Sequence, residues 1–450
     1  MSILNEDKIF PGESMKDSKI TRREFMKLAG SGAAAVALNS SVTGGLKSAF
    51  ANEFTPGRSG QKTFVFIFLA GGLTANAYCP YSSEYYQVSP DLHFNPTNSL
   101  VLNSTQGLHP SLTYFKSAYD QGNLALINSM SFTGAHNRSH ASAQHNLSRL
   151  QPNSRSSIDN PKGVLSYLAC LTPNQSADVP IQTLSLGTSP LTFGTCEDTR
   201  KRVVRVGSLD SLAGTQYRGS LNRTLGINFL RNQMRSLADE PKNIREEAYR
   251  EALNGFEDMH PSFLQINNTQ LPGSALFPAT ALGNDMRDIA KCIAADVTGT
   301  RFYTTTVGGW DLHNRELEFL PTRLGDLNNS IKAFFDALNV LGKADDIVLA
   351  CISEFTRTFQ NDPDPAIAGC DHGGGGHCVV MGNSINGGIK SPAYTNSDIT
   401  SALAADRRYV NTIHVDTRSA MRQIFDGGGY DISSALEGQD FPEVPLNLYT

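Results

Sequence analysis

The run Thr63–Leu69 (TFVFIFL), rich in large apolar side chains and soon followed by paired glycines, constrains the fold of this chain more than any other feature. An unbroken apolar run of this length suits a β-strand that is covered on both faces, as in a parallel sheet. Further segments with a strand pattern lie at 124–128, 302–307, 347–352 and 378–381. Helical periodicity around 111–119 and 322–341 gives the order strand, helix, strand, which is typical of βαβ units. We therefore expect an α/β fold.

Residues 151–300 interrupt this pattern. A polar stretch rich in Ser, Asn and Pro is followed by helix-like periodicity around 225–253 and 279–295. We interpret the segment as a central helical insertion or cap. The chain has no internal repeat and no heptad pattern, which argues against a solenoid or a coiled coil.

The first 51 residues resemble a twin-arginine export signal. The motif TRREFMK precedes the Ala/Gly-rich run 28–38, and Ala49–Ala51 forms a small-x-small cleavage pattern. The run has about half of the ~20 apolar residues that a bilayer span needs, so its length argues against an anchor. Signals of this kind engage the twin-arginine export machinery and direct the export of folded proteins, often with a cofactor already loaded. We expect a mature chain, 52–450, that is periplasmic or secreted.

The composition is that of a water-soluble globular protein, with 40% hydrophobic and 18% charged residues and a net charge of -5. Segment 1–51 is basic, so the rest is more acidic than the whole, which argues against a nucleic-acid partner held by phosphate contacts. Seven cysteines form no CxxC pair, which argues against a structural zinc site. Cys370 and Cys378 either pair across a glycine run or are buried as small hydrophobic side chains.

Polar side chains follow three of the expected strands. The first is followed by 71–76 (GGLTAN), the strand at 302–307 by 308–313 (GGWDLH), and the strand at 347–352 by 353–357 (SEFTR). In open α/β sheets, ligands bind beyond the carboxyl ends of the strands. We therefore expect a functional site at this edge of the sheet.

Carboxylates and imidazoles in these loops suit a divalent metal ion. Asp311 and His313 are two residues apart, so in an extended segment their side chains share one face. Other candidate ligands lie after later strands: Glu354, Asp371, His372 and His377. Such a set suits zinc or manganese or, with fewer histidines, magnesium or calcium. Two ions about 4 Å apart would stabilise both the attacking and the leaving oxygen of a phosphoryl or sulfuryl transfer.

Each candidate also has a structural alternative. Asp311 and His313 are compatible with a hydrogen-bonded turn, and 371–377 with an exposed glycine-rich loop. Glu354 and Arg357 are compatible with an ion pair. The coincidence of all these groups at ends of buried strands favours the functional interpretation.

The ordered motifs also resemble those of a known family. They include FVFIFLAGG, NRSHASAQ, GGWDLH, SEFTRT and DHGGGGH. This set resembles the bacterial exported family called domain of unknown function 1501, which is placed in the alkaline phosphatase and sulfatase superfamily. The resemblance spans nearly the whole mature chain and implies an α/β/α sandwich around a mostly parallel sheet. It also implies metal-ligand roles for the following residues: Asp311, His313, Glu354 and His377, with Asp371 and His372 matching the family's DHG element.

One position departs from that family. Members often carry an aspartate or serine shortly after the glycines of the first strand, where this chain has Thr74. The nucleophile is either Ser139, which His140 beside it would activate as a base at an expected helix start, or Thr74. Arg357 or Arg138 would hold the anionic group of a substrate.

These observations together predict a metal-dependent hydrolase of a small phosphate or sulfate ester. The alternative is a non-catalytic exported binding or assembly protein that keeps the fold but has lost part of the metal site. The neutral side chain of Thr74 favours this second interpretation.

Overall fold

The computed structural model describes residues 61–133, 138–152, 162–171, 181–192, 203–209, 261–361, 364, 367–404 and 412–450. The predicted export signal, 1–51, and the helical periodicity around 225–253 lie outside these residues. Among the described residues, no helix has both the length and the apolar character needed to cross a membrane.

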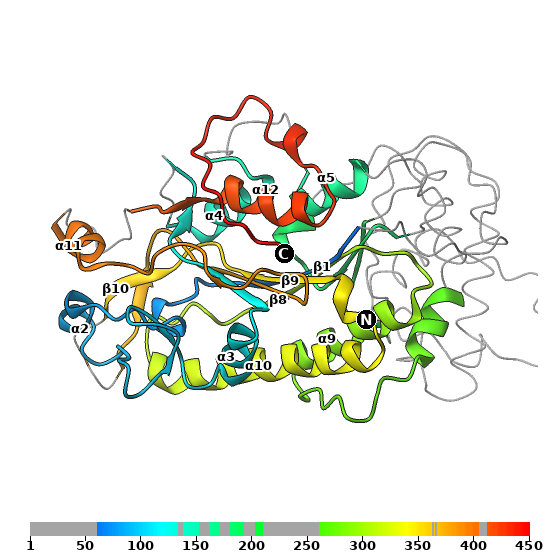
Figure 1. The fold of residues 1–450 in the computed structure, drawn as a ribbon, viewed down its shortest axis with the longest axis horizontal. Coiled ribbons are helices and arrows are strands. Elements are labelled where there is room, and N and C mark those ends of the chain that lie inside the picture. The colour runs from blue at the N-terminus through cyan, green and yellow to red at the C-terminus, as the bar shows by residue number, and fades with distance from the viewer. Residues whose placement is uncertain are drawn as a thin grey trace, which may run out of the picture.

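An eight-stranded sheet forms the centre of the described chain (Figure 1). In spatial order its strands are β13 (Gly388–Ile389), β4 (Leu124–Ile127), β12 (Cys378–Met381), β9 (Ile347–Ile352), β1 (Thr63–Leu69), β8 (Phe302–Val307), β6 (Thr183–Leu186) and β7 (Val203–Val206). Strand β12 is antiparallel to β4 and β9, whereas the other pairings in this sheet are parallel. The carboxyl ends of β1, β8 and β9 therefore lie at one edge, and the residue that precedes β12 lies at the same edge.

Helices cover both faces of the sheet (Figure 1). One layer contains α3 (Thr113–Asp120), α9 (Ala281–Ala295) and α10 (Glu316–Val340), and the other contains α4 (His140–Arg149), α5 (Val164–Leu171) and α12 (Thr417–Gly427). Outside these layers lie α2 (Ser83–Val88), α11 (Asn396–Ala404) and short strand pairs: β10 (Arg357–Asn361) with β11 (Cys370–His372), β14 (Val415–Asp416) with β5 (Met130–Ser131), and β2 (Leu100–Val101) with β3 (Gly107–Leu108).

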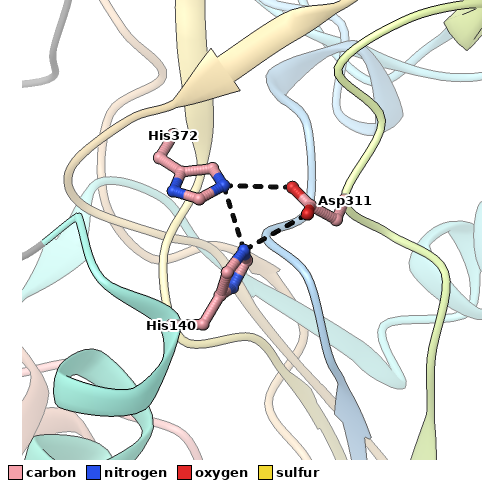
Figure 2. A group of neighbouring side chains, drawn as sticks. All are labelled: His140, Asp311 and His372. Atoms are coloured by element: carbon pink, nitrogen blue, oxygen red, sulfur yellow. Dashed lines mark hydrogen bonds and ion pairs between the residues drawn. The ribbon is translucent and has the colours of Figure 1, made fainter.

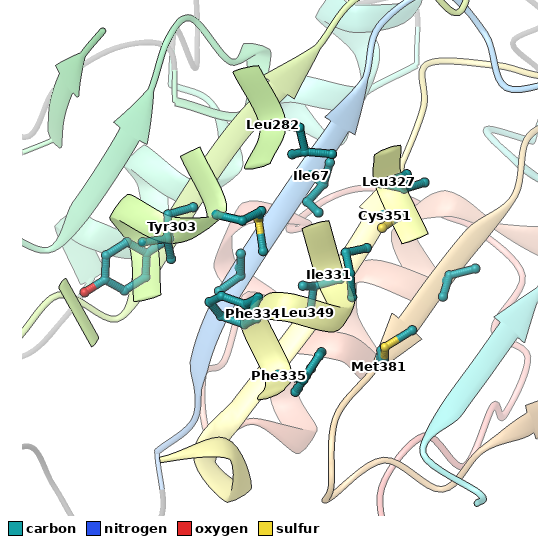
Figure 3. Packing of buried hydrophobic residues seen from close by; sticks show 14 of the residues in the cluster. Ile67, Leu282, Tyr303, Leu327, Ile331, Phe334, Phe335, Leu349, Cys351 and Met381 are labelled. Carbon is teal, nitrogen blue, oxygen red and sulfur yellow. The ribbon is translucent and has the colours of Figure 1, made fainter. Parts of the chain in front are cut away.

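Successive side chains of β1 enter two different hydrophobic clusters. Ile67 lies in the cluster that includes residues of α9 and α10, as Figure 3 shows for Leu282, Ile331 and Phe334. Phe66 lies in the cluster that includes residues of α4, α5 and α12. Because side chains alternate across a strand, an apolar run such as β1 can be buried on both faces. Each fully buried side chain of this size contributes roughly 1.5–3 kcal/mol to folding.

The α/β fold predicted from the sequence is confirmed, as a three-layer sandwich with a mostly parallel sheet. Four predicted strands, 63–69, 302–307, 347–352 and 378–381, have the same bounds in the structure. Strands β6 and β7 come from the segment interpreted as a helical insertion, so that segment also extends the central sheet. Its predicted helix at 279–295 corresponds to α9.

The structure decides between the two alternatives for Cys370 and Cys378. Cys370 and Cys378 are both free and buried, so they do not pair across the glycine run. Cys170 is disulfide-bonded. Among the described cysteines the free thiols therefore serve as small buried side chains.

Candidate metal centre

Side chains from separate parts of the chain meet beyond the carboxyl ends of β1, β8 and β9. The loop after β8 carries Asp311 and His313, and its Trp310 backbone N–H donates to the Ala70 carbonyl at the end of β1 (3.3 Å). His140 is the first residue of α4, and His372 is the last residue of β11. The parallel sheet aligns the strand ends at one edge, and the loops place these side chains together.

The imidazoles of His140 and His313 and the carboxylate of Asp311 gather around the imidazole of His372, and Figure 2 shows three of these four side chains, His140, Asp311 and His372. The Nε2 atom of His372 lies 3.0 Å from Nε2 of His140, 3.0 Å from Nε2 of His313 and 3.1 Å from Oδ1 of Asp311. The Nε2 atom of His140 lies 3.4 Å from Oδ2 of Asp311, and that of His313 lies 3.0 Å from Oδ1. This group of four residues is called the His/Asp cluster below.

In His140 and His372, the hydrogen bond made by Nδ1, which lies outside the cluster, determines which ring nitrogen carries the hydrogen. The Nδ1 atom of His140 lies 2.8 Å from Oε1 of Glu354, and Nδ1 of His372 lies 2.7 Å from the backbone carbonyl of Arg138. Since these oxygens accept, both Nδ1 atoms donate a hydrogen, and a neutral ring then turns its Nε2 lone pair inward. Two lone pairs at 3.0 Å repel each other unless a proton or a metal ion lies between them.

A metal ion fits this donor set. Zinc bound to imidazole nitrogen at about 2.0–2.1 Å would place its tetrahedral ligands about 3.3 Å apart, close to the distances of 3.0, 3.1 and 3.4 Å among His140, Asp311 and His372. Histidine ligands of metals generally donate their other N–H to a carboxylate or a backbone carbonyl, as His140 and His372 do. Three imidazoles favour zinc or another transition metal over magnesium and calcium, which prefer oxygen ligands.

The electrostatics keep Asp311 ionised and His313 neutral. Burial alone would raise the pKa of Asp311, but the hydrogen bond and charge of Arg357 outweigh it, so the pKa lies below its usual value. Desolvation and the positive charge of Arg357 lower the pKa of His313. Both states are those that a metal ligand requires.

Two predicted ligands occupy places around the His/Asp cluster. The side chain of Glu354 is fully buried, and its Oε1 atom accepts hydrogen bonds from the Gly71 backbone N–H (3.0 Å) and Gln144 (3.1 Å) as well as facing His140. Asp371 lies at the exposed edge, where it pairs with Arg138 at 2.9 Å and lies 3.7 Å from Nδ1 of His313. A second set of possible ligands, containing Asp371, shares His372 and His313 with the cluster. The described residues therefore offer one compact site rather than two independent ones.

The structure does not bring His377 into the His/Asp cluster. It is buried between the rings of Tyr78 and Tyr394, and its Nδ1 atom lies 3.1 Å from Oδ1 of Asn128. Its position follows from β12, whose antiparallel course begins at the site edge but directs this side chain inward. Burial lowers the pKa of His377 to about 3.

The predicted hydroxyls and arginines lie in different environments. Ser139 is exposed and is the N-cap residue of α4, whereas Thr74 is buried and its Oγ1 accepts a hydrogen bond from the Asn76 backbone N–H. Arg138 is partly exposed beside the cluster. Arg357 is fully buried and donates to Asp311 and to the carbonyls of Gly71 and Cys370, contacts that favour a role within the protein over direct binding of a substrate.

Sequence reasoning missed two neighbours of the site. Phe355 packs against the rings of His140 and His372, with centroid separations of 4.9 and 5.1 Å. Gln144, four residues after His140 on α4, donates to Glu354. The helical spacing of His140 and Gln144 could have indicated the second contact, because residues four apart on a helix are neighbours.

A family model with the description "Protein of unknown function (DUF1501)" matches residues 188–421. No curated protein matches the sequence. Solved structures with some likeness include the alkaline phosphatase of the Antarctic bacterium TAB5 (11% identity, TM-score 0.28, covering 77% of this chain and 98% of that one). Others are a lipoteichoic acid synthase of Listeria monocytogenes (9%, 0.32, 79% and 74%) and a sulfatase from Pseudoalteromonas sp. (11%, 0.32, 79% and 71%). At TM-scores of this size the likeness carries no argument about chemistry.

Proposed function

The chain belongs to the DUF1501 family, and we propose that it is an exported, metal-dependent hydrolase of phosphate or sulfate esters. The observation that carries the proposal is that the Nε2 atoms of His140 and His313 and the Asp311 carboxylate lie 3.0, 3.0 and 3.1 Å from the Nε2 atom of His372. A metal ion at this point would polarise the phosphoryl or sulfuryl oxygen of a bound ester.

Arg138 is suited to hold the anionic group of the ester. Its side chain is 40% exposed, and its Nε and Nη2 atoms donate to the His372 carbonyl and to Asp371. A guanidinium beside a metal centre offers a fork of donors that matches the oxygens of a phosphate or sulfate group. The Asp371 carboxylate orients this fork.

Ser139 is the better placed of the two candidate nucleophiles. It is exposed, it immediately precedes His140, and it occupies the N-cap position of α4 without a capping hydrogen bond from its side chain, where backbone amides favour developing negative charge. Thr74 is buried, and its hydroxyl accepts a hydrogen bond from the Asn76 backbone N–H in the adjacent turn. We therefore propose that Ser139 Oγ bonds to the phosphorus or sulfur atom as the bond to the ester's alcohol oxygen breaks, that the hydroxyl proton leaves with the alcohol, and that water then releases phosphate or sulfate from the serine.

Export is proposed on the twin-arginine pattern of residues 1–51. The disulfide at Cys170 supports it, because disulfides persist in oxidising compartments such as the periplasm. Expression of the full chain with the paired arginines replaced by lysines tests this part: the protein should then accumulate in the cytoplasm rather than outside it. Unchanged export of that variant would contradict the proposal.

Metal analysis of the purified mature protein tests the site. We expect close to one equivalent of transition metal, which Asp311→Asn should remove and Asp336→Asn should not, because Asp336 pairs with Lys332 away from the cluster. Hydrolysis of aryl phosphates or aryl sulfates should stop on chelation and return with zinc or manganese. A protein that binds no metal would refute the proposal, and a metal-loaded protein inactive on both ester classes would favour a binding role.

A further inference from the structure

We propose that Glu354, Phe355 and Arg357 do not bind the metal ion but hold its ligands in place, each supporting a different part of the His/Asp cluster. The three residues belong to one short segment after β9, which is called the support segment below. The inference deepens the proposed function and rests on it only in requiring that a cation binds.

Glu354 orients His140. Its Oε1 atom faces Nδ1 of His140 at 2.8 Å, on the side of the ring opposite the cluster. Gly71 and Gln144 also donate to Oε1. With Oε1 held by these contacts and the side chain fully buried, the carboxylate fixes the tautomer and direction of His140 and increases the basicity of its inner nitrogen.

Phe355 supports two imidazoles at once. Its ring is buried and lies against His140 and His372, tilted by 36° and 35°. Those two rings in turn lie edge to face at 4.2 Å. A flat side chain in this place restricts rotation of both ligands and excludes water from beneath them.

Arg357 fixes the carboxylate of the cluster. Its Nη1 atom donates to Oδ1 of Asp311 at 2.6 Å and to the Gly71 carbonyl at 3.0 Å, and its Nε atom donates to the Cys370 carbonyl at 3.0 Å. A buried guanidinium held by backbone carbonyls is itself rigid. It therefore sets the position of Asp311 and balances the charge of the carboxylate.

The support segment is anchored to the sheet edge. Ser353 Oγ donates to the Leu69 carbonyl at 2.6 Å, and Thr356 Oγ1 donates to the Leu73 carbonyl at 2.8 Å. The Thr356 backbone N–H donates to the Gly375 carbonyl at 2.7 Å. Contacts on both sides of the segment give its side chains a fixed base, which a ligand-positioning role requires.

Cobalt and zinc affinity, measured by competition with a chelator, tests the inference. The variants Glu354→Gln, Phe355→Leu and Arg357→Lys should each bind 10–100-fold more weakly, roughly the loss that follows removal of groups that orient metal ligands. Each should still bind one equivalent of Co²⁺ at saturation, with the visible absorption bands of the unmodified protein. The matched controls are Glu318→Gln, Phe359→Leu and Arg315→Lys: Glu318 and Arg315 pair with each other, and Phe359 packs against Tyr85.

Several results would overturn the inference. Unchanged affinity in all three variants would do so, as would loss of the bound equivalent or altered cobalt bands in Glu354→Gln, which would make Glu354 a ligand. Thermal unfolding identifies any variant that does not fold, and Glu354→Asp then replaces Glu354→Gln. The absence of cobalt and zinc binding in the unmodified protein would instead refute the proposed function, so the two failures are distinguishable.

Discussion

Asp311 and Arg357 form an ion pair of 2.6 Å in which the arginine is fully buried and the aspartate is 43% exposed. Oδ1 of Asp311 also lies 3.0 Å from Nε2 of His313 and 3.1 Å from Nε2 of His372, while Oδ2 lies 3.4 Å from Nε2 of His140. The buried arginine thereby holds the exposed carboxylate with both oxygens facing the histidines. This asymmetry distinguishes the site from an exposed acidic group, which has no fixed orientation.

His372 and His377 should respond differently to the same substitution. His372→Ala removes an inward-facing Nε2 atom and should abolish stoichiometric metal binding. His377→Ala removes a buried side chain and its contact with Asn128, so the free energy of unfolding should fall by about 2 kcal/mol while metal binding persists. Metal analysis and denaturant unfolding of both variants check this, and loss of metal from a folded His377→Ala protein would show that His377 is a ligand.

Two buried histidines should make the protein less stable in acid. Burial lowers the pKa of His377 to about 3 and that of His109 to about 4, from 6.5. Below pH 6.5 the unfolded chain binds these protons and the folded chain does not, so stability falls with pH by up to about 1.4 kcal/mol per unit for each histidine. Between pH 7 and pH 4, the free energy of unfolding should fall more steeply with pH for the unmodified protein than for His377→Gln or His109→Gln. Equal slopes would contradict the assignment.

The ion pair of Asp416 and Arg418 should contribute much more than a surface pair on the same helix. Both side chains are buried, with Nη2 and Oδ2 at 2.8 Å. Arg418→Ala leaves a buried carboxylate and should cost about 3–5 kcal/mol. Arg422→Ala breaks the exposed pair with Glu443 and should cost at most about 1 kcal/mol. Denaturant unfolding at pH 7 measures both, and similar losses would contradict the prediction.

The Asp416 carboxyl group of the same pair should also make the stability of the protein depend on pH. Burial raises the pKa of Asp416, but the hydrogen bonds from Arg418 and from backbone N–H groups outweigh it, so the pKa is lowered. A depressed carboxyl pKa gives stability that is complete above the pKa of the unfolded chain and is lost as the pH falls through the folded value. Asp416→Asn should therefore flatten the loss of stability below about pH 4. If Asp416→Asn lost stability at low pH as the unmodified protein does, another carboxylate would be responsible for the acid sensitivity.

Gly71 should be essential at the edge of β1. Its φ is +127°, and a Cβ atom there would lie 2.3 Å from the backbone nitrogen of Asp311. Gly71→Ala should displace the loop that carries Asp311, lowering both stability and metal affinity. Gly308→Ala, in the same loop with open space around it, is the control and should be near neutral. Equal metal affinity in the two variants would exclude the predicted displacement.

The sequence predicted the elements whose pattern is local. The strands at 63–69, 302–307 and 347–352 were readable because an apolar run of that length has few alternatives, and parallel pairing placed their polar ends together. Strands β6 and β7 were not predicted, since four-residue strands inside a polar segment give little pattern.

The sequence predicted most of the residues that meet at the candidate site but not the role of each one. Asp311, His313 and His372 do lie together, yet no spacing rule separates a ligand from the group that orients it, so Glu354 was predicted as a ligand. His377 was placed with the others because it follows the glycine run. The rotation of its side chain depends on the antiparallel course of β12, which sequence periodicity does not encode.

The four residues of the His/Asp cluster come from stretches of chain more than fifty positions apart, at 140, 311–313 and 372. An unfolded chain cannot present them together, so any cation they bind would favour the native state by mass action. A thermal-shift titration would then serve as a substrate-free assay: the melting temperature should rise with the concentration of each ion tried, and the size of the rise would rank the ions by preference.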